Sequence, residues 1–464
     1  MLFNSTVFLQ FFAAFLLLYF LCRNSLTGRN LLIVAGSWVF YGWWNYRFLA
    51  LLIFSGCFDF CLGRWLGSTV DDRKRKALVV MSVVANLSLL GFFKYYDFFV
   101  GSMNALLARM HVAVPLHALG IILPVGISFY TFQSLSYVID VYRRQVAPTP
   151  NLLQYLAYVS FFPQLVAGPI QRGHHLLPQL QQTLNIRPEM LAEGLWLIIW
   201  GLCKKVVIAD NLAPLVEMVF DNPAIAGPVI GLGALAFAFQ IYGDFSGYSD
   251  VARGLAKMLG FDLAENFNLP YFATDLREFW RRWHISLSTW LRDYLYISLG
   301  GNREGSRRTA VNVLITMLLG GLWHGAAWNF ILWGGWHGLG LLVTRWWQRR
   351  FPGRLPAWLS LPATFLFVLY GWLLFRAGSF ARIHALTASL TDWSAPVWLL
   401  HYAVSLVLIV TPLVVIEIWQ KRSQNLLAPL AAPWWLRHAL QGLLCLGLLL
   451  FWEVKSLPFI YFQF

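Results

Sequence analysis

The stretch LLGGLWHGAAWNFILWGGWHG, residues 318–338, decides the fold. It contains no Asp, Glu, Lys or Arg. An α-helix needs about 20 predominantly apolar residues to cross the hydrocarbon core of a bilayer. Small residues at 320, 321 and 325–327 allow a second helix or a substrate to approach closely. The stretch therefore predicts tightly packed membrane helices, with His324 and His337 buried among them.

The composition of the whole chain extends this prediction. Of the 464 residues, 58% are hydrophobic and only 12% are charged, whereas soluble domains carry about 25% charged residues. The net charge of +14 comes from short Lys and Arg clusters between apolar runs. Such clusters are typical of cytoplasmic loops, so they predict no nucleic-acid partner, although some could attract an anionic substrate. We expect one all-α, membrane-embedded domain over residues 1–464.

Hydropathy predicts about eleven or twelve crossing helices. Loop charges follow the first, third and fifth of the predicted helices, which places the N-terminus outside, in the periplasm of a bacterial inner membrane. Lys421, Arg422 and Arg437 precede the last predicted helix, which places the C-terminus outside as well. The candidate segments are 7–22, 31–46, 47–63, 77–97, 119–139, 189–208, 228–248, 309–330, 331–347, 359–376, 399–419 and 436–456.

Two stretches do not fit a simple crossing. Segment 152–170 carries Pro163 and Pro169, which predicts a broken, re-entrant segment covered by protein. The segment TDLREFWRRWHISLSTWLRDYLYISLGGNREGS, 274–306, is amphipathic and too charged to face lipid. It predicts an interfacial helix capped by Thr274 or Asp275, followed by a glycine turn.

Three histidines could carry chemistry. A neutral imidazole can take a proton near pH 7, so His324 is a candidate general base, although a lone buried histidine is more often a packing residue. His337 is better interpreted as a packing residue. His284 lies beside Arg281 and Arg282, either on a solvated face or in a pocket that binds phosphates.

A polar cluster interrupts the apolar segment YGDFSGYSDVARGLAKMLGF, 242–261. Its glycines at 243 and 247 suggest a broken helix that lines a cavity. Asp250 could pair with Arg253 one turn away, which we slightly favour, or could bind substrate. The five cysteines show no zinc-site spacing, so we expect no metal.

The segments 279–305 and 318–338 closely resemble the signature of bacterial membrane-bound O-acyltransferases, in the branch that acetylates alginate and cellulose. Segments 124–143, 161–172 and 242–261 are similar to the same branch, so the resemblance covers essentially the whole chain. It implies a ring of tilted helices around a central tunnel. It also implies that His324 matches the essential histidine of the family and that His284 matches its second functional histidine.

The resemblance implies an O-acetyltransferase mechanism. Acetyl-CoA from the cytoplasm would bind near Arg281, Arg282 and His284, and His324 would act as general base on an acceptor hydroxyl. Trp323, Asn329 and Asp250 would help to bind the substrate. The acetyl group would leave on the periplasmic side, toward a separate periplasmic or membrane-anchored transferase and a polysaccharide synthesis complex.

The C-terminal segment SLPFIYFQF, 456–464, is similar to the tail of a small companion peptide in teichoic-acid D-alanylation. By that likeness Tyr461 would be a transient acyl carrier. An interfacial aromatic anchor explains the same residues, and the enrichment of aromatic residues at membrane interfaces favours it.

Two other function classes stay open. A transporter would suit buried polar residues and broken helices, but no inverted repeat is apparent. A non-catalytic scaffold of an export complex would not need His324. The sequence also leaves alginate, cellulose and peptidoglycan open as the acetylated polymer.

Overall fold

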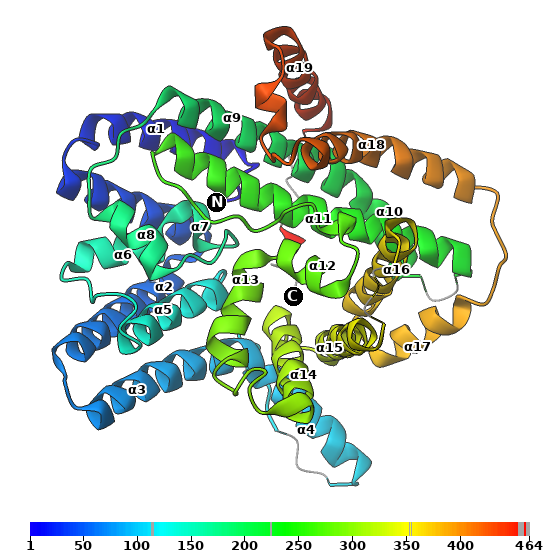
Figure 1. The fold of residues 1–464 in the computed structure, drawn as a ribbon, viewed down its shortest axis with the longest axis horizontal. Helices are drawn as coiled ribbons and strands as arrows, with labels where there is room; N and C mark the ends of the chain where they lie inside the picture. The colour runs from blue at the N-terminus through cyan, green and yellow to red at the C-terminus, as the bar shows by residue number, and fades with distance from the viewer. Residues whose placement is uncertain (113–115, 223–224, 352, 354, 453–458, 461–464) are drawn as a thin grey trace. The chain divides into compact units, whose positions relative to one another are not determined.

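The computed structural model describes residues 1–464 apart from 113–115, 223–224, 352, 354, 453–458 and 461–464 (Figure 1). The described residues form helices and connecting segments, with no strand among them, so the predicted all-α class is confirmed. They divide into two compact units. Unit 1 comprises Met1–Pro188 and Ala256–Ala264, and unit 2 comprises Glu189–Leu255 and Glu265–Phe464. A single domain over the whole chain stays a prediction.

Unit 1 contains the N-terminal helices. One long helix, α2, covers two predicted crossings, because the chain only kinks at Asn45, where the backbone is extended (φ −162°, ψ 109°). The elements are α1 (Thr6–Cys22), α2 (Leu26–Ser68), α3 (Asp72–Leu90), the π-helical η1 (Gly91–Tyr95), α4 (Tyr96–Arg109), α5 (Ile127–Tyr142), α6 (Leu152–Ser160), α7 (Phe162–Leu165) and α8 (Gly173–Leu180).

The predicted start of the 119–139 helix is wrong. α5 begins only at Ile127, because Gly126 before it has the left-handed φ of 76°. A Cβ at Gly126 would also lie 2.8 Å from the carbonyl oxygen of Leu165.

The predicted break in 152–170 is confirmed. α6 ends at Ser160, and the short α7 follows after Phe161. Buried side chains satisfy the freed backbone groups: the Gln133 and Gln164 amides donate to the carbonyl of Tyr158, at 2.6 and 2.9 Å. Irregular backbone is thus covered by protein, as a membrane environment requires.

Unit 2 holds most of the remaining elements. These are α9 (Pro188–Leu202), the π-helical η2 (Cys203–Ala209), α10 (Asp210–Phe220), α11 (Gly227–Met258, whose last turn counts with unit 1), η3 (Pro270–Phe272), α12 (Leu276–Arg282), α13 (Ile285–Trp290), the π-helical η4 (Leu291–Tyr296), α14 (Gly305–His324), α15 (Trp328–Arg350), α16 (Ala357–Arg376), α17 (Phe380–Ser389), α18 (Leu399–Ser423), η5 (Ala428–Ala431) and α19 (Trp434–Phe451).

The stretch 318–338 forms a tight helical hairpin. α14 ends at His324, the chain is extended at Gly325 and Ala327, and α15 begins at Trp328. A Cβ at Gly321 would overlap the backbone of α15, and one at Gly334 would overlap the backbone of α14. The predicted close approach through small residues is therefore confirmed.

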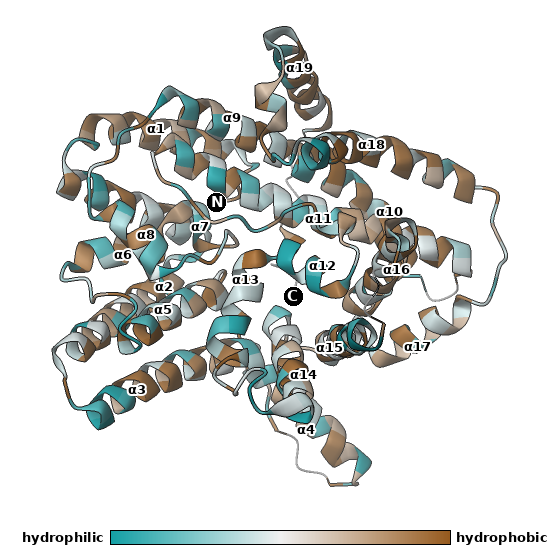
Figure 2. Cartoon of the chain, in the orientation of Figure 1, coloured by the Kyte–Doolittle hydropathy of each residue, from teal (hydrophilic) through white to brown (hydrophobic). Residues whose placement is uncertain are grey.

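Six helices are long and apolar enough to cross a membrane by length and composition. They are Leu26–Ser68, Asp72–Arg109, Gly227–Met258, Ala357–Arg376, Leu399–Ser423 and Trp434–Phe451. α18 is predominantly hydrophobic along its length (Figure 2), and it exposes Leu400, Val407 and Leu408 by 63–73%. Exposed apolar surface of this extent marks a lipid-facing helix. The predicted number of crossings, eleven or twelve, is larger than six because it also counts shorter segments that this length criterion leaves out.

Candidate active site

The two predicted histidines lie together in unit 2. His324 is the last residue of α14, and His284 lies between α12 and α13. Their exposed fractions are 4% and 0%, and their ring centroids are 6.2 Å apart. Residues 40 positions apart in sequence thus form one buried imidazole pair.

The interfacial segment is not one helix, which corrects the sequence prediction. It breaks at His284, which has the left-handed φ of 43°. Segment 266–268 holds this break: the Ile285 N–H donates to the carbonyl of Asn266, and the Asn268 N–H donates to that of Arg282, both at 2.9 Å. The break turns the His284 side chain away from the face that a continuous helix would give it. The predicted cap at Asp275 is confirmed, since its carboxylate accepts the Glu278 N–H at 2.8 Å.

Asn266 fixes the tautomer of His284. Its Oδ1 lies 3.3 Å from the Ser286 backbone N–H, which can only donate, so this amide atom must be the oxygen. The same Oδ1 lies 3.1 Å from His284 Nδ1, which must therefore carry the proton and donate it. His284 Nε2 then holds the lone pair. Burial also lowers the pKa of His284 to about 3, so the ring is neutral at physiological pH.

Aromatic rings enclose the pair. Trp323 lies 5.8 Å from the His284 ring and 5.2 Å from the His324 ring, and Trp333 lies 5.0 Å from His324. Phe245 packs edge-on against His284 at 4.6 Å. This apolar shell favours neutral imidazoles and strengthens any hydrogen bond made to them.

Asn329 lies near this pair, but its side-chain amide is hydrogen-bonded to a backbone carbonyl. Its amide donates to the carbonyl of Phe375 at 2.8 Å, and the Phe375 ring lies 5.7 Å from His324. Asn266, Trp333 and Phe375 were not predicted from the sequence. An isolated amide and two aromatic residues in an aromatic-rich chain carry no pattern that would have identified them.

Arg281 and Arg282, predicted to bind the donor, differ in their surroundings. Arg281 is exposed. Arg282 forms an ion pair with Glu278 at 2.8 Å and donates to the carbonyl of Asn268 at 3.1 Å. Arg282 thus stabilises the short α12 within unit 2.

Asp250 belongs to a band of ion pairs between α11 and η2. Its carboxylate lies 2.6 Å from Lys204 Nζ and 3.7 Å from Arg253, so the predicted pair with Arg253 exists but Lys204 is closer. The neighbouring Lys205 lies 2.5 Å from Asp244 and 2.8 Å from Asp210.

The predicted break in α11 is wrong. The helix is continuous from Gly227 to Met258. A Cβ at Gly247 would lie 2.6 Å from the carbonyl oxygen of Gly201, and one at Gly243 would lie 2.8 Å from that of Lys204. These glycines therefore serve close packing of two helices rather than a break.

Two residues near the C-terminus pack into unit 2. Phe459 lies 5.7 Å from Phe245, the ring that contacts His284, and the Ile460 N–H donates to Asp244 at 2.7 Å. Their exposed fractions are 2% and 5%. Tyr461, predicted as an acyl carrier, lies outside the described residues.

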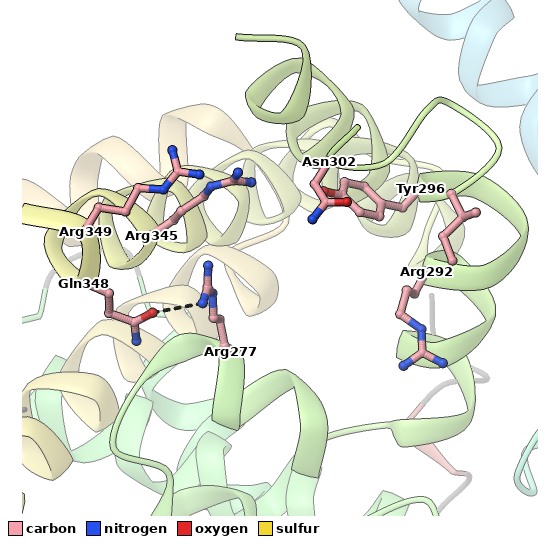
Figure 3. A pocket seen from close by; sticks show the side chains of 8 residues that line it. Arg277, Arg292, Tyr296, Asn302, Arg345, Gln348 and Arg349 are labelled. Carbon is pink, nitrogen blue, oxygen red and sulfur yellow. Dashed lines mark hydrogen bonds between the residues drawn. The ribbon is translucent and has the colours of Figure 1, made fainter. Parts of the chain in front are cut away.

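A second feature of unit 2 is a basic cavity of about 630 Å³ (Figure 3). Arg345 and Arg349 project from α15 and Arg277 from α12, while the opposite side is formed by the segment that follows α13. The lining residues are Arg277, Arg292, Tyr296, Ile297, Asn302, Arg345, Gln348 and Arg349.

Comparison with known proteins places this geometry in a family. Residues 143–381 match the membrane-bound O-acyltransferase family. The chain is 45% identical over 402 residues to "Probable alginate O-acetylase AlgI" of Azotobacter vinelandii, covering 85% of this chain and 79% of that protein. It is 46% identical over 382 residues to the protein of the same name from Pseudomonas aeruginosa, covering 81% and 72%. It is 37% identical over 414 residues to "Peptidoglycan O-acetyltransferase" of Helicobacter pylori, covering 81% and 77%. This chain therefore belongs to the membrane-bound O-acyltransferase family and is a multi-pass bacterial membrane O-acyltransferase.

Proposed function

We propose that this chain transfers the acetyl group of acetyl-CoA to a hydroxyl acceptor for O-acetylation of an extracellular polysaccharide. The observation that carries the proposal is the buried pair of His284 and His324, with ring centroids 6.2 Å apart. This separation is short enough for one small group to contact both rings. The names of the similar proteins favour acetyl as the acyl group and alginate as the polymer.

The proposed chemistry needs one proton acceptor. The hydroxyl oxygen attacks the thioester carbonyl carbon while His324 takes the hydroxyl proton. The C–S bond then breaks, and the protonated His324 returns its proton to the departing thiolate. One ester and one free thiol replace one thioester and one hydroxyl, so no further reactant is required.

His284 supplies a second acceptor nitrogen to the same centre. With its Nδ1 proton donated to Asn266, its Nε2 can only accept a hydrogen bond. We assign it to holding the acceptor molecule. Trp323 would form a wall of the site, and Arg281, Arg282, Asn329 and Asp250 stay predictions as substrate-binding residues.

The tail offers a specific candidate for the first acceptor. Ile460 is hydrogen-bonded to Asp244, and Phe459 packs on the ring that contacts His284. Tyr461 follows directly in the sequence. This placement of its neighbours supports a role for the Tyr461 hydroxyl as a transient acyl carrier, and an aromatic anchor remains the alternative.

The reaction requires partners on both faces of the membrane. We propose that acetyl-CoA arrives from the cytoplasm and that both termini are periplasmic. A separate periplasmic or membrane-anchored transferase would then move the acetyl group to the polysaccharide, in association with the synthesis complex.

The test is His324→Ala, with O-acetyl esters measured on the secreted polymer and the membrane level of the protein held equal. Loss of a general base lowers the rate by about 10²- to 10⁴-fold, so we expect acetylation to vanish while polymer yield is normal. His337→Ala is the matched control. Normal acetylation in His324→Ala would refute the assignment, and loss of the polymer itself would indicate an export scaffold.

A further inference from the structure

The basic cavity of unit 2 holds more positive charge than its surroundings neutralise. Arg292 is paired with Asp293 at 2.7 Å. In the part of the chain that the structure describes, no carboxylate lies within 4.0 Å of the guanidinium groups of Arg277, Arg345 or Arg349. Arg345 and Arg349 are also one helical turn apart on α15, where like charges repel.

Hydrogen bonds hold two of these arginines, Arg277 and Arg349, in place without neutralising them. Arg277 donates to the Gln348 side-chain oxygen at 2.9 Å, and Arg349 donates to the Ser306 hydroxyl at 3.0 Å. Gln348 in turn donates to Asp275 at 3.1 Å. Figure 3 shows the Arg277–Gln348 bond at one side of the cavity, with Arg345 and Arg349 beside it. Three unneutralised guanidinium groups around one cavity, two of them held by hydrogen bonds, are suited to a ligand with several phosphate oxygens.

We propose that Arg277, Arg345 and Arg349 bind the phosphate groups at the nucleotide end of acetyl-CoA, an inference that rests on the proposed function. A guanidinium group matches a phosphate with two parallel hydrogen bonds. Across the cavity Tyr296 offers a half-buried ring for an adenine base. Gly301 lies against that ring with a φ of +59°, so the approach is free of a side chain.

The size of the cavity favours a small molecule over a protein. Its volume of about 630 Å³ falls within the usual range for ligand sites, roughly 300–1,000 Å³. A protein partner would need about 800 Å² of contact surface on each side. The phosphate of an anionic lipid headgroup shares the same chemistry and is the competing source.

The distance from the cavity to the histidines suits a donor with a long arm. Arg345 follows Trp333 by twelve residues on α15, about 18 Å at the rise of an α-helix. The Trp333 ring lies 5.0 Å from that of His324. The pantetheine arm of coenzyme A, when extended, has a length of this order. A nucleotide held at Arg345 could therefore present its thioester to the histidine pair.

The experiment measures binding without requiring turnover. The full-length chain is placed in nanodiscs of purely zwitterionic lipid and titrated with adenosine 3′,5′-bisphosphate, which carries two phosphates but no acyl group. We expect Arg345→Gln and Arg349→Gln each to weaken binding about tenfold or more, as loss of a charged hydrogen bond does. Arg350→Gln removes the same charge one residue beyond the cavity and should bind like the native chain. Adenosine without phosphate should bind weakly to all four proteins.

Three other outcomes would contradict either the phosphate site or the proposed reaction. Equal binding of the bisphosphate to native and Arg345→Gln proteins would overturn the proposal. Failure of the bisphosphate to bind, together with anionic lipid that is retained by the native chain and lost by Arg345→Gln, would identify a lipid headgroup site instead. Binding that depends on Arg345 in a chain that never forms acetyl esters would support the phosphate site and refute the proposed reaction. The two ideas therefore fail separately.

Discussion

Replacing Asn266 should reveal how the chain controls His284. Three donors converge on its Oδ1: His284 Nδ1 at 3.1 Å, the Ser286 N–H at 3.3 Å and the Ser286 hydroxyl at 2.9 Å. Asn266→Ala removes the acceptor and leaves all three without it. The His284 ring then loses the bond that fixes its tautomer and orientation.

The magnitude follows from the number of bonds. Each neutral hydrogen bond contributes about 1 kcal/mol net, so loss of the two Ser286 bonds and of the bond that the Asn266 amide donates to the Ser249 hydroxyl at 3.1 Å predicts about 3 kcal/mol lower unfolding free energy. Loss of the His284 bond and of its tautomer preference should raise the reaction barrier by about 1.4 kcal/mol, a rate decrease of about tenfold. We expect this decrease at every pH.

Asn266→Asp distinguishes loss of His284 orientation from general destabilisation of the fold. A carboxylate accepts the same three bonds, although it no longer donates to Ser249, and it places a negative charge beside His284, which raises the pKa of that ring from about 3. Since the protonated ring has no lone pair at Nε2, the rate should be near native in alkaline buffer and should fall as the pH approaches the raised pKa. The native rate should show no such step.

The assay is acetyl-ester formation from labelled acetyl-CoA in membranes containing equal amounts of each variant, measured across pH. Asn268→Ala is the control, because Asn268 contacts Arg282 only through its backbone groups. If Asn266→Ala retained the full rate, or if Asn266→Asp kept the native pH profile, the role of Asn266 in orienting His284 would be refuted.

Three further predictions concern stability. Asp250→Asn removes the carboxylate 2.6 Å from a buried lysine ammonium, and loss of one partner of a buried pair should cost about 3–5 kcal/mol, measurable as a lower midpoint of thermal aggregation in detergent. Gly334→Ala adds a methyl group that overlaps a carbonyl oxygen of α14, so it should destabilise the chain by about 1–3 kcal/mol, whereas Gly335→Ala, which makes an ordinary contact at 3.4 Å, should not. Burial opposes ionisation of Glu278, but hydrogen bonds from its neighbours still lower its pKa below 4.5. Its contribution to stability is therefore fully present above pH 4.5 and is lost as the pH falls through the lowered pKa, so Glu278→Gln should cost about 1 kcal/mol at pH 7 and progressively less as the pH is lowered below 4.5, by the same thermal assay.

The helical architecture could be predicted from the sequence because lipid imposes a strong constraint on composition. Every predicted crossing overlaps a helix of the structure. The start of α5 and the continuity of α11 were mispredicted, because in each case a glycine acts through a distant backbone group. Gly126 approaches Leu165, and Gly247 approaches Gly201, and neither partner can be identified from local sequence.

The site was predictable only in part for a related reason. His284 and His324 stand out because ionisable residues are rare in apolar stretches. Asn266 contacts His284 only because the helix breaks there in a left-handed conformation. The local sequence does not predict this break, since a histidine among Trp and Arg residues is equally compatible with a continuous helix. The arginines of α15 belonged to the loop charges, of which the sequence says only that some could attract an anionic substrate, and their convergence with Arg277 depends on how α12 packs on α15.

The π-helical turn η2 should make the number of residues between α9 and α10 hard to change. A π-turn contains one residue more than the α-helical turn it replaces, and it carries Lys204 and Lys205, which reach Asp250 and Asp244 on the same helix α11. Deleting a single residue between 203 and 209 would restore an α-helical turn and keep the flanking helices in phase, but it would remove one of the side-chain positions that the π-turn presents. Both lysines could then no longer face α11 together. Homologous sequences should therefore tolerate substitutions in this segment more readily than an insertion or a deletion, although nothing in its composition distinguishes it from an ordinary helix.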